Sequence, residues 1–159
     1  MKRRDRWAVM ASIVLAMLVG SMDTTIANTT MPVIAAELGG SEWYAWTFAS
    51  YMIFSTVVSP IAGRLSDLFG RKKVFAAGII LFMIGSGLCG LSADMLQLVL
   101  FRALQGFGAG FMLPFPAIIA GDLFTVEKRG KIQAFFSGVW GLSTMLAPVL
   151  GAFFVKFAS

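Results

Sequence analysis

The sequence predicts an all-α integral membrane protein with five transmembrane helices, and three observations support this fold class. Hydrophobic residues make up 58% of the chain and charged residues only 13%, against about 25% charged residues in soluble domains. The charges are clustered, so that residues 43–63, 74–93 and 132–155 contain no Asp, Glu, Lys or Arg. These charge-free segments hold 21, 20 and 24 residues, and a helix needs about 20 residues to cross a bilayer.

Two further spans each contain one charged residue. The first span covers about residues 7–36 and contains Asp23, and the fourth covers about residues 95–121 and contains Arg102. The charge-free segments are the second, third and fifth spans. Each span must be helical, because a single segment in lipid satisfies its own backbone hydrogen bonds only as a helix.

The basic residues predict the orientation in the membrane. Eleven of the 13 Lys and Arg residues precede the first span or lie in the second and fourth connections, and the first and third connections have none. The positive-inside rule therefore predicts that the N-terminus and the basic loops are cytoplasmic. We expect a multi-pass protein of the plasma (inner) membrane. Basic residues spread over short loops are poorly placed to follow a phosphate backbone, so we expect no nucleic-acid partner.

Several classes of function are excluded by composition. The chain has no histidine and a single cysteine, Cys89, which excludes histidine-based catalysis, a histidine or multi-cysteine metal site and a disulfide framework. The basic N-terminus followed by an apolar run has the form of a signal peptide. However, the apolar run continues past Asp23 without a preceding small-x-small cleavage pattern, so we expect an uncleaved first span. We do not expect an enzyme.

The two charged residues inside spans are the first candidates for function. A charge at the centre of a membrane helix costs roughly 2.5–3.5 kcal/mol on insertion scales, so each one marks a pathway or an ion pair. Helical rise places both Asp23 and Arg102 in the outer half of the membrane. We expect Asp23 to carry a proton and Arg102, which stays charged, to be its fixed countercharge. The alternative is that Asp23 only caps a helix break or holds Arg102.

The connection between the second and third spans carries a specific pattern. Residues 63–73 read GRLSDLFGRKK, with two glycines, one acid and four bases. This segment resembles the signature loop between the second and third spans of the major facilitator superfamily of transporters. A plain determinant of topology is the alternative, but it does not explain the Gly-x-x-x-Asp-x-x-Gly-Arg spacing.

The resemblance implies that this segment is a conformational-switch loop. Asp67 and Arg71 would join a cytoplasmic charge network with Asp122, at the end of the fourth span, and that network would lock the outward-facing state. In addition, we expect Gly63 to let a neighbouring helix approach and Gly70 to let the chain turn.

The fourth span contains a second motif. Residues 102–110 read RALQGFGAG and are similar to the fourth-span motif of the superfamily's drug/proton antiporters, in which the arginine is associated with proton transfer. Arg102, Gln105 and Gly106 share one helical face. Gly106 and Gly110 form a small-xxx-small pair that allows another helix to approach closely, and packing alone is the alternative role of the glycines.

The first span resembles the motif L-D-x-T-I-V-N-x-A-L-P of the antiporter branch that usually has 14 spans. Residues 22–32 read MDTTIANTTMP and depart from that motif at four positions. Thr24 and Asn28 lie four residues apart, so they could line the cavity beside Asp23. The motif favours multidrug efflux over sugar or metabolite carriers.

The fifth span offers a weaker match, to the antiport motif G-x-x-x-G-P-x-x-G-G. Small residues and a proline predict a bent, closely packed helix. The resemblance implies that this helix is linked to antiport, and a generic packing face is the alternative. Alanine replaces glycine at residues 147 and 152. The matching residues are Gly138, Gly141, Pro148 and Gly151.

Together these motifs identify the chain, by resemblance, as an N-terminal fragment of a drug/proton antiporter of the major facilitator superfamily. It would hold five helices of an incomplete six-helix N-terminal half, with the sixth span and the C-terminal half absent, and would be inactive alone. The expected function is proton-coupled export of lipophilic or cationic drugs by alternating-access antiport, driven by the proton gradient without a cofactor or metal. The expected partners are the bilayer, a small-molecule substrate and the missing C-terminal half. The alternatives are a metabolite or organic-acid carrier of the same superfamily and a non-transporting helix-bundle protein.

Overall fold

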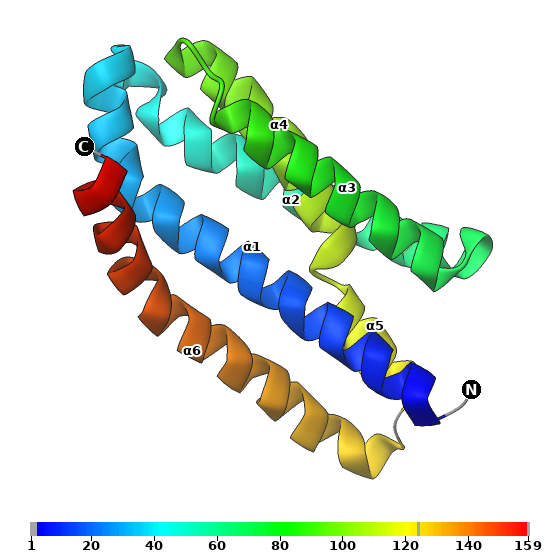
Figure 1. Cartoon of the computed structure of the whole chain (residues 1–159). Helices are drawn as coiled ribbons and strands as arrows, with labels where there is room; N and C mark the ends of the chain where they lie inside the picture. Colours follow the sequence, from blue (N-terminus) through cyan, green and yellow to red (C-terminus); the bar gives the residue numbers. More distant parts are fainter. Residues whose placement is uncertain (1–2, 124, 159) are drawn as a thin grey trace. The chain divides into compact units, whose positions relative to one another are not determined.

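The computed structural model describes the backbone of residues 3–123 and 125–158 and the side chains of residues 9–122 and 125–146. Every secondary-structure element within these ranges is a helix (Figure 1), which confirms the predicted all-α class. The elements are α1 (Arg3–Leu38), the short 3₁₀ helix η1 (Ser41–Trp43), α2 (Tyr44–Phe69), α3 (Arg71–Cys89), α4 (Met95–Met112), α5 (Phe115–Leu123) and α6 (Val126–Ala158).

Four segments of the described residues are long and apolar enough to cross a membrane. They are Val9–Leu38, Ser41–Phe69, Arg71–Cys89 and Met95–Asp122, and they correspond to the first four predicted spans. The fifth predicted span, 132–155, lies within α6. The side chains of its last part, from residue 147 on, lie outside the described residues.

The second connection is much shorter than predicted. Helix α2 continues to Phe69 and α3 begins at Arg71, so Gly70 is the only residue between them. The prediction of an eleven-residue loop is therefore wrong, since all but one of these residues are helical. Gly70 has φ +90°, a conformation that residues with a Cβ rarely adopt, and the turn that we expected at this glycine is confirmed.

The fourth predicted span is interrupted. Helix α4 ends at Met112 and α5 starts at Phe115 (Figure 1), instead of one helix over 95–121. Pro114 and Pro116 explain the break, because neither has an N–H for the helical ladder and the ring of a proline clashes with the carbonyl group four residues before it. By contrast, Pro32 and Pro60 lie inside α1 and α2, which continue past them.

The chain divides into two units. One comprises residues 1–30 and 116–159 and the other residues 31–115. In the second unit, α4 packs along both α2 and α3, which contact each other far less. Helix α4 is accordingly the most buried of the three.

Glycines bring α4 close to both neighbours. A Cβ at Gly106 would lie 2.8 Å from the Tyr51 Cα of α2, and one at Gly108 would lie 2.7 Å from the Phe82 Cα of α3. A Cβ at Gly110 would lie 2.7 Å from the Val58 Cβ of α2. Contacts of this kind are typical of membrane helices, where small residues let backbones approach.

In the first unit, a buried polar contact joins α1 and α6. The Ser21 hydroxyl is hydrogen-bonded to the Ser143 hydroxyl, and both side chains are almost completely buried. The Ser21 hydroxyl also donates to the Leu18 carbonyl oxygen of its own helix, at 3.0 Å. Hydroxyl pairs between apolar helices are one of the ways in which membrane helices are held together.

Candidate functional site

A buried arginine lies at the centre of the second unit. Arg102, on α4, is only 5% exposed. Its Nη1 donates to the Gln105 Oε1 at 3.0 Å, and its Cζ lies 5.6 Å from the centroid of the Tyr51 ring on α2. The guanidinium is thus held by an amide acceptor of its own helix and an aromatic face of a neighbouring helix, and both contacts favour a positive charge.

Gln105 is shared between two donors. Its Oε1 also lies 3.8 Å from the Cys89 Sγ at the end of α3, in hydrogen-bonding geometry. Gln105 is 1% exposed, and its described contacts are with Arg102 of its own helix and with Cys89 and Gly85 of α3. The fourth-span motif therefore draws contacts from all three helices of the unit.

Two glycine contacts fix the groups around Arg102. Gly106 lies against the backbone of Tyr51, where a Cβ would collide with the Tyr51 carbonyl oxygen. Gly85 of α3 lies against the backbone of Gln105, where a Cβ would stand 2.7 Å from the Gln105 backbone nitrogen. The positions of the ring and the amide are thus tied to the helix spacing on both sides of α4.

Sequence reasoning missed Tyr51 and Gly85. Tyr51 is not among the Asp, Glu, Lys and Arg residues that the sequence argument followed and is part of no recognised motif, and only the α2–α4 contact reveals that it lies beside the guanidinium. No pattern within one helix would have identified it.

The predicted proton carrier, Asp23, and the two polar residues expected beside it belong to the first unit. Asp23 and Thr24, on α1, are half-buried, and Asn28 is exposed. The Thr24 hydroxyl donates to the Ser21 carbonyl oxygen at 2.9 Å, so this threonine satisfies its polar group within its own helix, as is usual in apolar surroundings.

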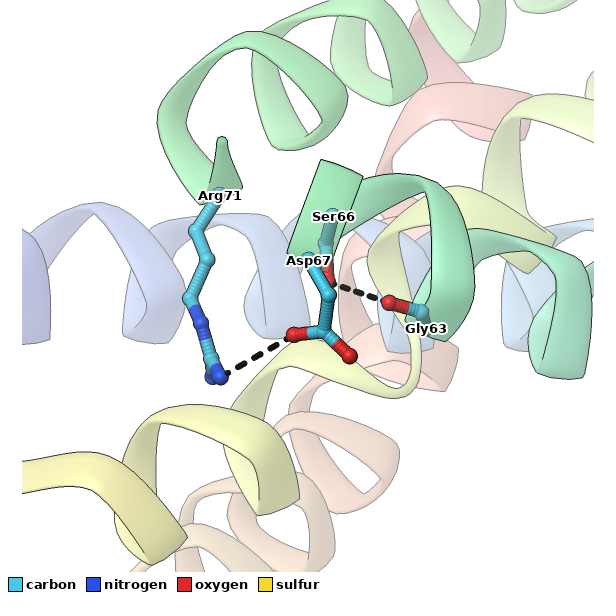
Figure 2. Close-up of polar contacts among 4 residues, drawn as sticks. All are labelled: Gly63, Ser66, Asp67 and Arg71. Atoms are coloured by element: carbon cyan, nitrogen blue, oxygen red, sulfur yellow. Dashed lines mark hydrogen bonds and ion pairs between the residues drawn. The ribbon is translucent and has the colours of Figure 1, made fainter. Parts of the chain in front are cut away.

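The predicted switch segment lies at the α2–α3 connection. Figure 2 shows the Arg71 guanidinium beside the Asp67 carboxylate, with Nη2 and Oδ1 3.4 Å apart. The Ser66 hydroxyl donates to the Gly63 carbonyl oxygen at 2.7 Å. Arg71 begins α3, where a positive charge opposes the helix dipole, and the Asp67 carboxylate offsets that charge.

The approach of a neighbouring helix that we expected at Gly63 stays a prediction. A Cβ there would meet no described atom within 4 Å. Asp122, the third member of the predicted charge network, is exposed in the last turn of α5 and belongs to the first unit.

The weaker motif on α6 is only partly described. A Cβ at Gly138 or Gly141 would meet no described atom within 4 Å. Helix α6 continues past Pro148 and Gly151, whose surroundings lie outside the described side chains.

The end of α5 is held by an arginine that the sequence did not indicate. Arg129, in the first turns of α6, donates from Nη2 to the Gly121 carbonyl oxygen at 2.7 Å. This carbonyl is one of the last of α5, where a helix lacks internal partners and where positive charge is favourable.

A buried charge inside a bundle of membrane-length helices is typical of polytopic membrane transporters. The chain belongs to the Major Facilitator Superfamily, whose family profile matches residues 13–159. This is a family of transporters and not of enzymes.

Several relatives carry names that refer to multidrug resistance, multidrug transport or efflux. The chain is 48% identical over 144 residues to "Multidrug resistance protein 3" of Bacillus subtilis (strain 168), covering 91% of this chain and 28% of the relative. It is 40% identical over 154 residues to "Multidrug transporter protein MdtP" of the same organism, covering 97% of this chain and 28% of the relative. It is 36% identical over 148 residues to "Efflux pump dotC" of Dothistroma septosporum, covering 93% of this chain and 26% of the relative. The chain therefore spans just over a quarter of the length of these relatives.

Proposed function

We propose that this chain is the N-terminal part of a multidrug efflux transporter that exports lipophilic or cationic compounds in exchange for protons. The observation that carries the proposal is the buried Arg102, held by Gln105 and Tyr51 between three membrane-length helices. The names of the relatives support the substrate class.

The buried guanidinium argues for a role beyond packing. An arginine in an apolar bundle keeps its charge, and burying that charge is costly unless partners compensate. Here a glutamine and an aromatic ring, both almost completely buried, surround it. A bundle that only had to be stable would place an apolar residue at this position. We therefore assign Arg102 as the fixed countercharge and Asp23 as the proton carrier of the exchange, with Thr24 and Asn28 beside it.

The α2–α3 connection supports the alternating-access part of the proposal. Asp67 and Arg71 pair across Gly70, and in the complete transporter this pair and Asp122 form the network that holds the outward-facing state. The network lies on the cytoplasmic side, as does the N-terminus.

The length of the chain bears on activity. Because the matched relatives are more than three times as long, we propose that transport needs the remaining helices, including a C-terminal half, and that the 159 residues alone do not transport.

The test uses the complete transporter in proteoliposomes with an imposed pH gradient. Transport of a fluorescent lipophilic cation is followed for wild type, for Asp23→Asn and for a matched control, Glu37→Gln, which removes an exposed carboxylate in the last turn of the same helix. We expect gradient-driven transport in wild type and the control and its loss in Asp23→Asn. If wild type moves no such cation under any gradient, drug efflux is wrong, and transport of organic acids or metabolites under the same gradient would replace it.

A further inference from the structure

We propose that Tyr51 is a positioning residue that holds the Arg102 guanidinium in the place where it acts on proton exchange. This inference rests on the proposed function, because it assigns Tyr51 a part in the coupling that we attribute to Arg102. No motif includes Tyr51, and the contact with Arg102 is made only when α2 and α4 pack.

The first argument is the chemistry of the contact. An aromatic face attracts a cation within about 6 Å of its centroid, and the attraction grows when both groups are shielded from water. The Arg102 Cζ lies at 5.6 Å, and Tyr51 and Arg102 are 9% and 5% exposed. Together with the hydrogen bond to Gln105, the ring restricts a long side chain that would otherwise sample several rotamers.

The second argument is the composition of α2. Its buried residues are Thr47, Ser50, Tyr51, Ser55, Val58, Ala62 and Ser66. Tyr51 is the one aromatic residue in this set, in a helix whose other buried residues are small enough to let α4 approach. A large ring at this single level therefore needs a reason other than close packing, and the guanidinium beside it supplies one.

The third argument is the glycine opposite the ring. Gly106 lies one helical turn beyond Arg102 and presses against the backbone of Tyr51. The same turn of α4 thus carries the Arg102 guanidinium and, through Gly106, sets the distance between α4 and Tyr51. The position of the arginine therefore depends on the spacing of α2 and α4, because a wider spacing would weaken the ring contact.

The test compares Tyr51→Phe, which keeps the ring, with Tyr51→Leu, which removes it. Phe54→Leu is the matched control, because Phe54 lies on the same helix and is 43% exposed. Two activities of the complete transporter are measured in proteoliposomes: transport of the lipophilic cation driven by a pH gradient, and exchange of labelled for unlabelled cation without a gradient. The second activity needs substrate binding and helix movement but no net proton transfer.

We expect Tyr51→Leu to reduce gradient-driven transport on the order of tenfold, which lies between the values for an exposed and for a fully shielded cation–π contact, while cation exchange is unchanged. Tyr51→Phe and Phe54→Leu should match wild type in both assays. Equal losses of both activities in Tyr51→Leu would reduce Tyr51 to a structural residue, and a loss in Tyr51→Phe as large as in Tyr51→Leu would assign the effect to the hydroxyl. Either result overturns the proposal. Gradient-driven transport at the wild-type rate in Tyr51→Leu would overturn it as well.

A spectroscopic measurement separates this inference from the proposed function. In the 159-residue chain in detergent micelles, the Arg102 Nε–H resonance is assigned by its loss in Arg102→Lys. We expect it to shift in Tyr51→Leu, because the ring current is removed, and to stay in place in Phe54→Leu. Absence of coupled transport in wild type would refute the proposed function alone, whereas an unshifted resonance in Tyr51→Leu would refute the ring contact whatever the transport result.

Discussion

Gly85 of α3 lies directly against Gln105 of α4, so that a Cβ at residue 85 would stand 2.7 Å from the Gln105 Cα. Gln105 in turn accepts a hydrogen bond from the buried Arg102. The α3–α4 spacing at this one glycine therefore sets the position of the amide that holds the charge.

The contact at Gly85 predicts that even a methyl group will disturb the site. Gly85→Ala forces α3 and α4 apart at Gln105, and overpacking of this kind costs about 1–3 kcal/mol. We expect a lower thermal unfolding midpoint for the 159-residue chain in detergent and weaker gradient-driven transport by the complete protein. Gly87→Ala is the control, since a Cβ at Gly87 would meet no described atom within 4 Å. An equal effect of both substitutions would mean that helix propensity and not the contact is responsible.

Removing the amide acceptor should leave the guanidinium without its hydrogen bond to Gln105. Gln105→Leu has similar volume but no oxygen, and a hydrogen bond to a charged group contributes about 1.5–3 kcal/mol to stability. We expect reduced stability in thermal unfolding and loss of gradient-driven transport. Gln105→Glu keeps an acceptor oxygen at the same place and should recover most of the stability. If Gln105→Leu is as stable as wild type, the hydrogen bond from Arg102 contributes nothing to folding.

The conformation of Gly70 predicts a penalty for any side chain there. At φ +90° and ψ 136°, a Cβ strains the backbone by about 1–3 kcal/mol. Gly70→Ala should therefore lower the unfolding midpoint of the chain in detergent, although a Cβ there would meet no described atom within 4 Å. An unchanged midpoint would show that the α2–α3 connection relaxes to a helical conformation without cost.

The Asp67–Arg71 pair should matter for transport more than for folding. Both side chains reach solvent, with Asp67 69% exposed, and surface ion pairs contribute about 0–1 kcal/mol. Asp67→Asn should therefore barely change thermal unfolding of the chain, whereas it should strongly impair cation export by the complete transporter. If export persists at the wild-type rate, Asp67 has no part in the conformational switch. A large loss of stability would instead indicate a structural role.

The fold class could be predicted from the sequence because a single segment that crosses lipid can satisfy its backbone hydrogen bonds only as a helix. Charge-free runs of membrane length must be helices, so residues 43–63 and 74–93 identified α2 and α3 without any tertiary information. The helix ends were less predictable. Residues 64–69, which include the charged Arg64 and Asp67, still belong to α2, since a helix can continue beyond the apolar core into water, and charge alone does not end it.

The candidate site could be predicted only where the information lies within one helix. Arg102 and Gln105 share a helical face by spacing, and the hydrogen bond between them follows from that spacing. The ring of Tyr51 lies 51 residues away in sequence, and the contact depends on how closely α2 approaches α4. The break after Met112 was also missed, because prolines in membrane helices are often accommodated, as at Pro32 and Pro60, and the two prolines at 114 and 116 act together.

The single residue between α2 and α3 also limits how these two helices move. One residue supplies about 3.5 Å of extended chain, whereas one turn of a helix advances about 5.4 Å. Neither helix can slide along its axis by a whole turn unless it draws the other with it or unwinds an end. In a transport cycle, α2 and α3 would thus tilt together. A displacement of one helix along its axis would be transmitted to the other through the backbone that joins them.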